Sequence, residues 1–391
     1  MRRATAVLTL TAMLVVAGTG LAAASGARPR ASGFGRRYVP AAMAVYEWHQ
    51  AGQLPDDEVT QRLRFLRANG FRTVFLELGD YLDAAELAPG TPGRQALLAR
   101  IRRQLQRFVG LASDAGVAVQ ALGGGPGWTG ELRYLGQELV QLVADYNLTV
   151  ARRERLQGVQ LDIEPYTVDG WFDDPATGLG DYLTMAADVV GTYRTALERS
   201  ANRHLQLGFA VPFWFDARGD VPGPVAFDGA TKPAVHHLID LVGDLPGAYL
   251  VVMAYRDFTG TSNGSIAHAR DEFRYAAATR ARCGLVVGQQ YGPAGPDEQH
   301  ITFNGQPRSD FLRGGGRHHH RLPPLPPVPR AVGRRPRRLP GRRPLSRRGS
   351  RPPRPLPTPV GVRPVDHAGP QPPPAEEMGP WVRTSRSRPR R

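Results

Sequence analysis

Cysteine and lysine are nearly absent from this sequence. Cys283 is the single cysteine in 391 residues, which excludes an intrachain disulfide framework and any metal site built from clustered cysteines. Lys232 is the single lysine, so arginine carries nearly all of the positive charge. Aromatic residues make up only 8% of the chain and hydrophobic residues 41%, and both shares are ordinary for a globular domain.

Most of the chain has no excess of positive charge. The formal net charge is +15, yet residues 313–391 hold 20 Arg against three acidic side chains. The first 312 residues therefore hold 30 basic against 32 acidic side chains. We expect no nucleic-acid binding by this folded part, because the basic character belongs to the last fifth of the chain.

The N-terminus has the pattern of a secretory signal peptide. Arg2 and Arg3 precede an apolar run over residues 4–21, and small residues follow at 22–26. We predict a signal peptide over residues 1–24 that is cleaved near Ala24, and a flexible linker over residues 25–37. The protein is then secreted or extracytoplasmic, and we expect no membrane span after cleavage.

Residues 38–312 alternate short apolar runs with longer helical patterns, as in βα units. We predict a (β/α)₈ barrel, an α/β fold, whose last βα unit is missing or disrupted. The expected strands are 42–47, 73–78, 117–122, 158–164, 206–211, 249–254 and 284–289. The expected helices are 56–69, 94–115, 132–153, 181–200, 233–242 and 266–281.

Polar or aromatic residues follow almost every predicted strand. This distribution favours a site at the carboxyl-terminal mouth of a barrel over the single switch point of an open sheet. The residues expected there are Glu47, Trp48, Glu77, Asp80, Trp128, Asp162, Glu164, Trp214, Tyr255, Asp257 and Gln290.

The densest signal is the segment from Leu156 to Tyr166. Strand alternation predicts that Gln160, Asp162 and Glu164 share one face, with neighbouring side chains roughly 6 to 7 Å apart. Two carboxylates in a partly dry barrel repel each other, so one pKa is expected to rise, as a general acid at neutral pH requires. The alternative is that these acids only cap loops or pair with an arginine.

This segment resembles a motif of the family 18 glycoside hydrolases, the chitinase and endo-N-acetylglucosaminidase group. That family carries D-G-x-D-x-D-x-E on the fourth barrel strand, and residues 157–164 have the sequence Q-G-V-Q-L-D-I-E. It also carries M-x-Y-D on the sixth strand, where Met253-Ala254-Tyr255-Arg256-Asp257 stands here. Both motifs fall on the expected strands of this sequence, the fourth and the sixth in chain order.

The resemblance implies roles for three residues. Glu164 matches the general acid, Asp162 the carboxylate that orients the substrate acetamide, and Tyr255 the hydroxyl that holds the acetamide oxygen. The implied reaction is retaining hydrolysis in which the sugar's own acetamide is the nucleophile. Such a site needs no metal and no cofactor. The implied partner is a glycan that contains N-acetylhexosamine, and we expect a monomer.

Three positions depart from the family motifs. Gln157 and Gln160 replace the first two aspartates, and Arg256 stands where M-x-Y-D has its aspartate. Gln160 can donate a hydrogen bond to Asp162, which we expect to keep Asp162 ionised. We predict substrate binding by Gln160, Glu47, Glu77, Trp214, Asp257 and Gln290.

Two other functions stay open. The barrel is either a non-catalytic carbohydrate-binding protein with a decayed site, or a conventional glycosidase that pairs Glu164 with Glu47 or Glu77. Tryptophans near the strand ends suit stacking on sugar faces, although loop packing explains each of them equally well. These are Trp48, Trp128, Trp171 and Trp214.

Residues 313–391 have a different composition. They hold 20 of the 36 prolines and no Tyr or Phe, so we predict a disordered basic tail. The alternative is translation in the wrong frame. With C in third codon positions, a one-base shift over residues 314–321 gives codons for Ala and for Ile or Thr. That frame continues a helix from near Asp310, and His318–His320 then has no metal role.

Overall fold

The computed structural model describes residues 13–17, 43–216, 223–258, 262–292 and 300–306. The predicted linker over residues 25–37 and the predicted tail over residues 313–391 lie outside the described residues.

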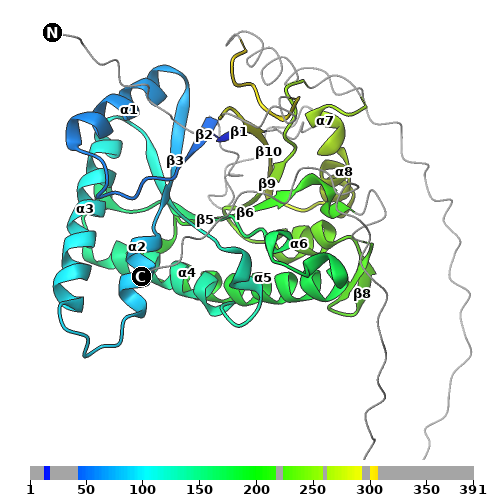
Figure 1. The fold of residues 1–391 in the computed structure, drawn as a ribbon, viewed down its shortest axis with the longest axis horizontal. Helices are drawn as coiled ribbons and strands as arrows, with labels where there is room; N and C mark the ends of the chain where they lie inside the picture. The colour runs from blue at the N-terminus through cyan, green and yellow to red at the C-terminus, as the bar shows by residue number, and fades with distance from the viewer. Residues whose placement is uncertain (1–12, 18–42, 217–222, 259–261, 293–299, 307–391) are drawn as a thin grey trace, which may run out of the picture. The chain divides into compact units, whose positions relative to one another are not determined.

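In the described part of the chain, seven parallel strands form the wall of a barrel (Figure 1). They overlap the seven predicted ranges, so the prediction of an α/β barrel is confirmed. In order around the barrel they are β2 (Met43–Glu47), β3 (Phe71–Glu77), β4 (Ala118–Gly123), β5 (Gly158–Leu161), β6 (Gln206–Pro212), β9 (Ala248–Met253) and β10 (Gly284–Gln290).

The barrel is closed by a strand that the sequence did not predict. β1 (Met13–Ala17) lies between β10 and β2 and runs antiparallel to both. It pairs with Val286 to Gln290 of β10 and with Ala44 and Val45 of β2. A complete barrel of this kind has an eighth parallel strand at this place. Here the place is taken by residues from the apolar run of the predicted signal peptide.

Helices surround the strands (Figure 1). Each of the six predicted helices is present, and the predicted helix 266–281 is divided into two at Ala269. The short helix α2, after β3, was not predicted. The helices are α1 (Asp56–Ala68), α2 (Gly79–Glu86), α3 (Arg94–Asp114), α4 (Tyr134–Thr149), α5 (Pro175–Glu198), α6 (Ala234–Val242), α7 (Ser265–His268) and α8 (Arg270–Thr279). A hairpin of β7 (Val225–Phe227) and β8 (Ala230–Lys232) precedes α6. Of the helices described, none has the length and apolar character to cross a membrane.

Local sequence explains where α1 begins and ends. Pro55 has the extended conformation that precedes the first turn, and three acidic residues over 56–58 lie in that turn, where the helix dipole favours negative charge. Gly70 follows the helix with φ of +93°, a conformation that L side chains rarely adopt. The chain therefore turns directly into β3.

Two apolar layers hold the barrel together. The outer layer packs the strands against the helices, and the inner layer fills the barrel with side chains such as Tyr46, Phe75 and Tyr249. Gly208 makes room for this inner layer, because a Cβ there would lie 2.0 Å from Oε1 of Gln160 and 2.3 Å from the Tyr249 ring. The interior is thus a packed core, and the site must lie at its end.

Deletion of residues 1–24 should destabilise the barrel. Removal of β1 leaves unpaired backbone groups along β2 and β10, and exposed strand edges favour aggregation. We expect a melting temperature lower by several degrees and faster aggregation on heating, measured by circular dichroism and light scattering. Deletion of residues 1–12 alone keeps β1 and is the matched control. Equal melting temperatures for the two deletions would show that β1 adds nothing to stability.

Candidate active site

The candidate site is built on β5 and the residues that follow it. Asn147 of α4 fixes the start of the strand, because its side chain both donates to the carbonyl of Leu156 and accepts from the N–H of Leu156, each at 2.9 Å. At the other end, the N–H of Asp162 donates to the carbonyl of Gly123 at 3.0 Å. Asp162 is therefore held at the carboxyl end of the barrel by backbone pairing.

Gly124 permits this arrangement. Its φ is +152°, and a Cβ at this position would lie 2.2 Å from the carbonyl oxygen of Asp162. Any other residue would force the backbone of β4 away from Asp162. The glycine at the start of the loop after β4 thus allows the backbone of this loop to lie close to the backbone of Asp162.

Asp162 is the most perturbed carboxylate of the site. Its side chain keeps a small exposed fraction, but Oδ1 is enclosed and has no hydrogen-bond partner in the described part of the chain. Burial, and next the charges of Glu164 and Glu77, raise the pKa of Asp162 to about 8. Burial therefore favours the protonated form of this carboxyl group in the free protein.

Glu164 lies next to Asp162, just after the strand. Burial raises the pKa of Glu164, and a hydrogen bond with Tyr166 acts in the opposite direction. Tyr166 is itself held by aromatic packing, with its ring 4.8 Å from that of Trp214 and 6.4 Å from that of Trp171. A raised pKa favours the protonated form of the carboxyl group, which is the form that a general acid needs.

Tyrosines surround the two acids. Burial is the largest cause of the raised pKa of both Tyr46 and Tyr255, and the charge of Asp162 adds to it. Asp162, Glu164 and Tyr255 thus lie close enough for the charges of the two acids to raise the pKa of the Tyr255 hydroxyl. Tyr46 was not predicted as a site residue. Its inward position could have been read from strand alternation, but nothing in the sequence shows which strands face Asp162.

The expected hydrogen bond from Gln160 to Asp162 is wrong. Gln160 donates through Nε2 to the hydroxyl of Tyr46 at 3.0 Å. No hydrogen bond from Gln160 offsets the burial of Asp162. The expectation that Gln160 keeps Asp162 ionised is therefore also wrong, because the amide is used inside the barrel.

Glu77, at the end of β3, belongs to the acidic site. It raises the pKa of Asp162 through its charge, and its own pKa is raised by burial and next by Asp80 and Asp83. Its Oε1 accepts a hydrogen bond from the N–H of Gly79 at 2.8 Å. The loop that leads into α2 therefore fixes this carboxylate.

Glu47 is held differently, although it ends the neighbouring strand β2. Its two oxygens pair with Arg62 at 2.9 Å and with His49 at 2.7 Å. Arg62 also pairs with Glu58 at 2.7 Å. Of the two glutamates predicted to accompany Glu164, Glu77 lies close enough for its charge to raise the pKa of Asp162, whereas Glu47 belongs to a network with Arg62 and His49.

Arg256 and Asp257 lie in the loop after β9, and Gln290 is the last residue of β10. Arg256 does not replace the missing aspartate in the site, since its guanidinium lies over the ring of Phe213 at 5.3 Å. Asp257 accepts a hydrogen bond from Gln306 at 2.9 Å. The carbonyl of Gln290 accepts from the N–H of Phe303 at 3.0 Å.

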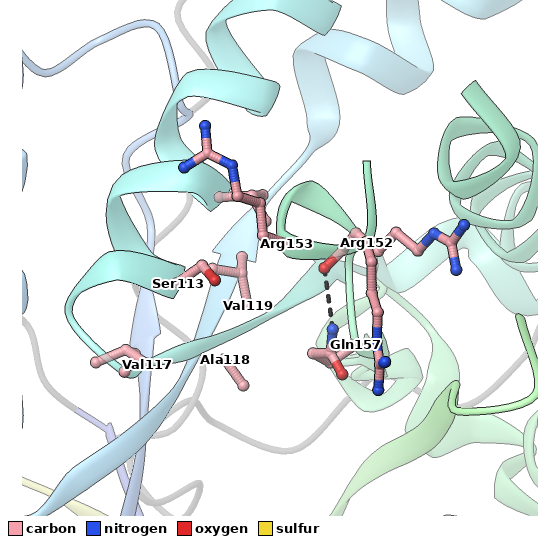
Figure 2. Close-up of a pocket in the computed structure, with 10 residues that line it drawn as sticks. Ser113, Val117, Ala118, Val119, Arg152, Arg153 and Gln157 are labelled. Carbon is pink, nitrogen blue, oxygen red and sulfur yellow. Dashed lines mark hydrogen bonds between the residues drawn. The ribbon is translucent and has the colours of Figure 1, made fainter. Parts of the chain in front are cut away.

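A separate cavity of about 230 Å³ lies at the other end of the barrel. It is lined by the residues that precede β4 and β5, among them Ser113, Arg152, Arg153 and Gln157. Figure 2 shows the guanidinium group of Arg153 pointing away from Arg152 and Gln157. The described residues that line this cavity include no carboxylate, so it is separate from the acidic site.

The comparisons with known proteins give similarity of fold only. No protein-family profile matches the sequence, and no curated protein matches it. Among solved structures, the chain is similar to a class V chitinase from Nicotiana tobaccum, with a TM-score of 0.35 and 13% identity over 62% of this chain. That match spans 65% of the tobacco chain, which is less than two thirds of its length.

Two further similar structures are a family 18 chitinase and an O-GlcNAc hydrolase. The chitinase, from Cycas revoluta in complex with (GlcNAc)3, has a TM-score of 0.35 and 17% identity over 69% of this chain and 80% of its own. The hydrolase, from Thermobaculum terrenum, has a TM-score of 0.37 and 9% identity over 64% of this chain and 47% of its own. At such identities the likeness says nothing of activity.

Gly124→Ala should disrupt the site. The new Cβ would meet the backbone of Asp162 and would require a positive φ of a non-glycine residue, so we expect a loss of at least about 2 kcal/mol of stability. Chemical denaturation measures this loss. Gly90→Ala is the control, because a Cβ there meets nothing within 4 Å. Equal stability of the two variants would contradict the close approach at Gly124.

Asp162→Asn should change how stability depends on pH. The pKa of Asp162 rises from 3.8 to about 8 on folding, so the folded state binds more protons between these values. Its favourable contribution is complete below pH 3.8 and is lost as pH rises through 8. The Asn variant should therefore gain stability relative to the native protein as pH rises from 4 to 8, by several degrees in melting temperature. A constant difference across this range would contradict the raised pKa.

Proposed function

We propose that this protein is a glycoside hydrolase that cleaves glycans containing N-acetylhexosamine with retention of configuration. The observation that carries the proposal is the pair Asp162 and Glu164 at the carboxyl end of β5, where burial raises both pKa values. Tyr255 lies close enough for both acids to raise the pKa of its hydroxyl. A substrate-assisted reaction needs these three groups and no second carboxylate nucleophile.

The reaction proceeds in two steps. In the first, protonated Glu164 gives its proton to the glycosidic oxygen while the acetamide oxygen of the same sugar attacks the anomeric carbon, so the glycosidic bond breaks and an oxazolinium-like ring forms. Asp162 faces the acetamide N–H and Tyr255 holds the acetamide oxygen. In the second step, ionised Glu164 takes a proton from water, which opens the ring with net retention.

The arrangement of charges favours this mechanism over a pair of Glu164 with Glu47. Glu47 pairs with Arg62 at 2.9 Å and is hydrogen-bonded to His49 at 2.7 Å, so it is poorly suited to act as a nucleophile. Glu77 is the remaining candidate for a two-carboxylate reaction. A binding protein without catalysis is disfavoured, because acids that are buried close together, with no basic partner in the part of the chain that the structure describes, are costly to keep.

We also propose that the protein is exported. The proposal rests on the two arginines, the apolar run and the small residues of the first 26 positions. Because β1 lies within this apolar run, cleavage near Ala24 would remove the strand that closes the barrel. N-terminal sequencing of the protein recovered from the culture medium tests both points.

Glu164→Gln should lower kcat by at least about 100-fold, since general acid catalysis contributes 10² to 10⁴. Release of reducing ends from N-acetylglucosamine oligomers measures the loss. Exposed Glu131→Gln, which removes the same charge, should keep full activity. Unchanged turnover in Glu164→Gln would overturn the proposed role.

A substrate without the acetamide distinguishes the mechanisms. The substrate-assisted reaction requires this group, so the matching glucose oligomer should not be cleaved at a measurable rate. Cleavage of the glucose oligomer, together with its loss in Glu77→Gln, would instead establish a two-carboxylate glycosidase.

A further inference from the structure

A second cavity lies among the helices that follow β3 and β4. It has a volume of about 380 Å³ and is lined by residues of α2, α3 and α4. Helix α2 contacts both of the other helices (Figure 1). Pockets that bind small molecules measure about 300 to 1,000 Å³. The cavity is therefore large enough for a small organic ligand.

The wall that α3 contributes to this cavity has a positive charge at each end and an apolar middle. Arg94, Leu98 and Arg102 all line the cavity, and their spacing of four residues places them along one face of the helix. The Cα atoms of the two arginines lie roughly 12 Å apart, at 1.5 Å per residue. Leu142 of α4 also lines the cavity. Apolar surface thus lies between two guanidinium groups.

A contact with α2 orients Arg102. Its Nε donates to the hydroxyl of Tyr81 at 2.7 Å, and its guanidinium carbon lies 5.8 Å from the centre of the Tyr81 ring. In the described part of the chain, the two terminal nitrogens of Arg102 have no hydrogen-bond partner. Two parallel N–H groups of a guanidinium match the two oxygens of a carboxylate. Arg102 is therefore held in place with its carboxylate-binding edge free.

Arg94 is anchored at the other end of the cavity. Its Nη2 donates to the carbonyl of Ala85 on α2 at 2.8 Å. Its Nε is enclosed and has no hydrogen-bond partner among the described residues. Buried donors are normally paired. A ligand that brings an acceptor to Arg94 would satisfy this group.

Acidic residues of the adjoining helices are engaged elsewhere. Glu86 of α2 accepts a hydrogen bond from the hydroxyl of Tyr134 at 2.7 Å, and Asp145 of α4 pairs with Arg199 at 2.6 Å. The described residues that line the cavity include no carboxylate. The charges of Arg94 and Arg102 are thus available to an anion from outside the chain.

The arrangement selects among anions by shape. A small inorganic anion can contact one guanidinium group at a time, and it leaves the apolar wall between the two arginines uncovered. A chain with a carboxylate at each end can reach both arginines and also bury apolar surface, which adds to the affinity. The cavity therefore suits an elongated dicarboxylate better than an inorganic anion.

We propose that this cavity binds an elongated organic dicarboxylate, with one carboxylate on Arg102, the other on Arg94, and an apolar chain over Leu98 and Leu142. The proposal is independent of the reaction proposed above, because none of the acids of the candidate active site lines this cavity. Its test is therefore a binding measurement that needs no turnover.

Titration calorimetry of the full-length protein with decanedioate tests the proposal. This ligand has ten carbons, and its carboxylates are roughly as far apart as the two arginines. We expect saturable binding of one ligand per protein molecule. Decanoate, which has one carboxylate, should bind at least about tenfold more weakly, because hydrogen bonds to charged groups are strong. The neutral 1,10-decanediol should not bind measurably. Equal affinity for decanoate and decanedioate, or equal binding of the diol, would overturn the proposal.

Two charge variants test the arginines. Arg94→Gln and Arg102→Gln should each weaken the binding of decanedioate at least about tenfold. Arg103→Gln is the matched control, because Arg103 is exposed on the same helix and does not line the cavity. It should bind decanedioate as the native protein does. The same loss of affinity in all three variants would show a general effect of charge and would contradict a specific site.

A third variant tests the position of the ligand without removal of either arginine. Ala99 is exposed and lines the cavity, so the larger side chain in Ala99→Phe should fill the space and abolish binding. Circular dichroism shows that each variant keeps its fold. Native affinity in Ala99→Phe, or in both arginine variants, would place the ligand elsewhere and overturn the proposal.

Discussion

The site depends on an acidic side chain, Asp162, that the fold keeps buried at the end of the barrel and for which the described residues offer no ion pair. Asp162 follows the four-residue strand β5, and its backbone N–H donates to the carbonyl of Gly123 at the end of β4. The enclosed Oδ1 has no hydrogen-bond partner in the described residues. Burial of such a group costs free energy unless it is protonated. The free protein therefore keeps a proton there, and any ligand that changes this must supply charge or hydrogen bonds of its own.

The barrel interior is specialised to support this acid. Gln160 precedes Asp162 by two residues in the chain, and its side-chain amide donates a hydrogen bond to the hydroxyl of Tyr46. Deeper inside, the hydroxyl of Tyr249 donates to Gln120 at 2.8 Å. These bonds engage the amide N–H of Gln160 and the hydroxyl of Tyr249 inside the core, apart from the acidic pair at the mouth.

Closure of the barrel poses a separate constraint. Parallel strands leave unpaired backbone groups at each edge of a sheet, and an incomplete barrel has two such edges. Here β1 covers both of them, with more extensive pairing to β10 than to β2. The same residues are predicted to direct export. Removal of the N-terminal segment, as proposed above, would therefore take away the strand that closes the barrel.

Sequence alone determined the seven parallel strands, most of the helices and the acids that follow β5. These features are local: apolar periodicity defines each element, and alternation defines the side on which Asp162 and Glu164 lie. The motif at Tyr255 also comes from sequence. Short elements were missed, since α2 and the β7–β8 hairpin are too brief to show a period.

Only the tertiary structure decided which polar strand ends meet. It places Glu77 with Asp162 and leaves Glu47 with Arg62, although both glutamates end neighbouring strands. It gives the amide of Gln160 to Tyr46 and not to Asp162, and it closes the barrel with β1. Each of these outcomes depends on contacts between residues far apart in the chain, and local pattern carries no information about which distant group arrives at a given side chain.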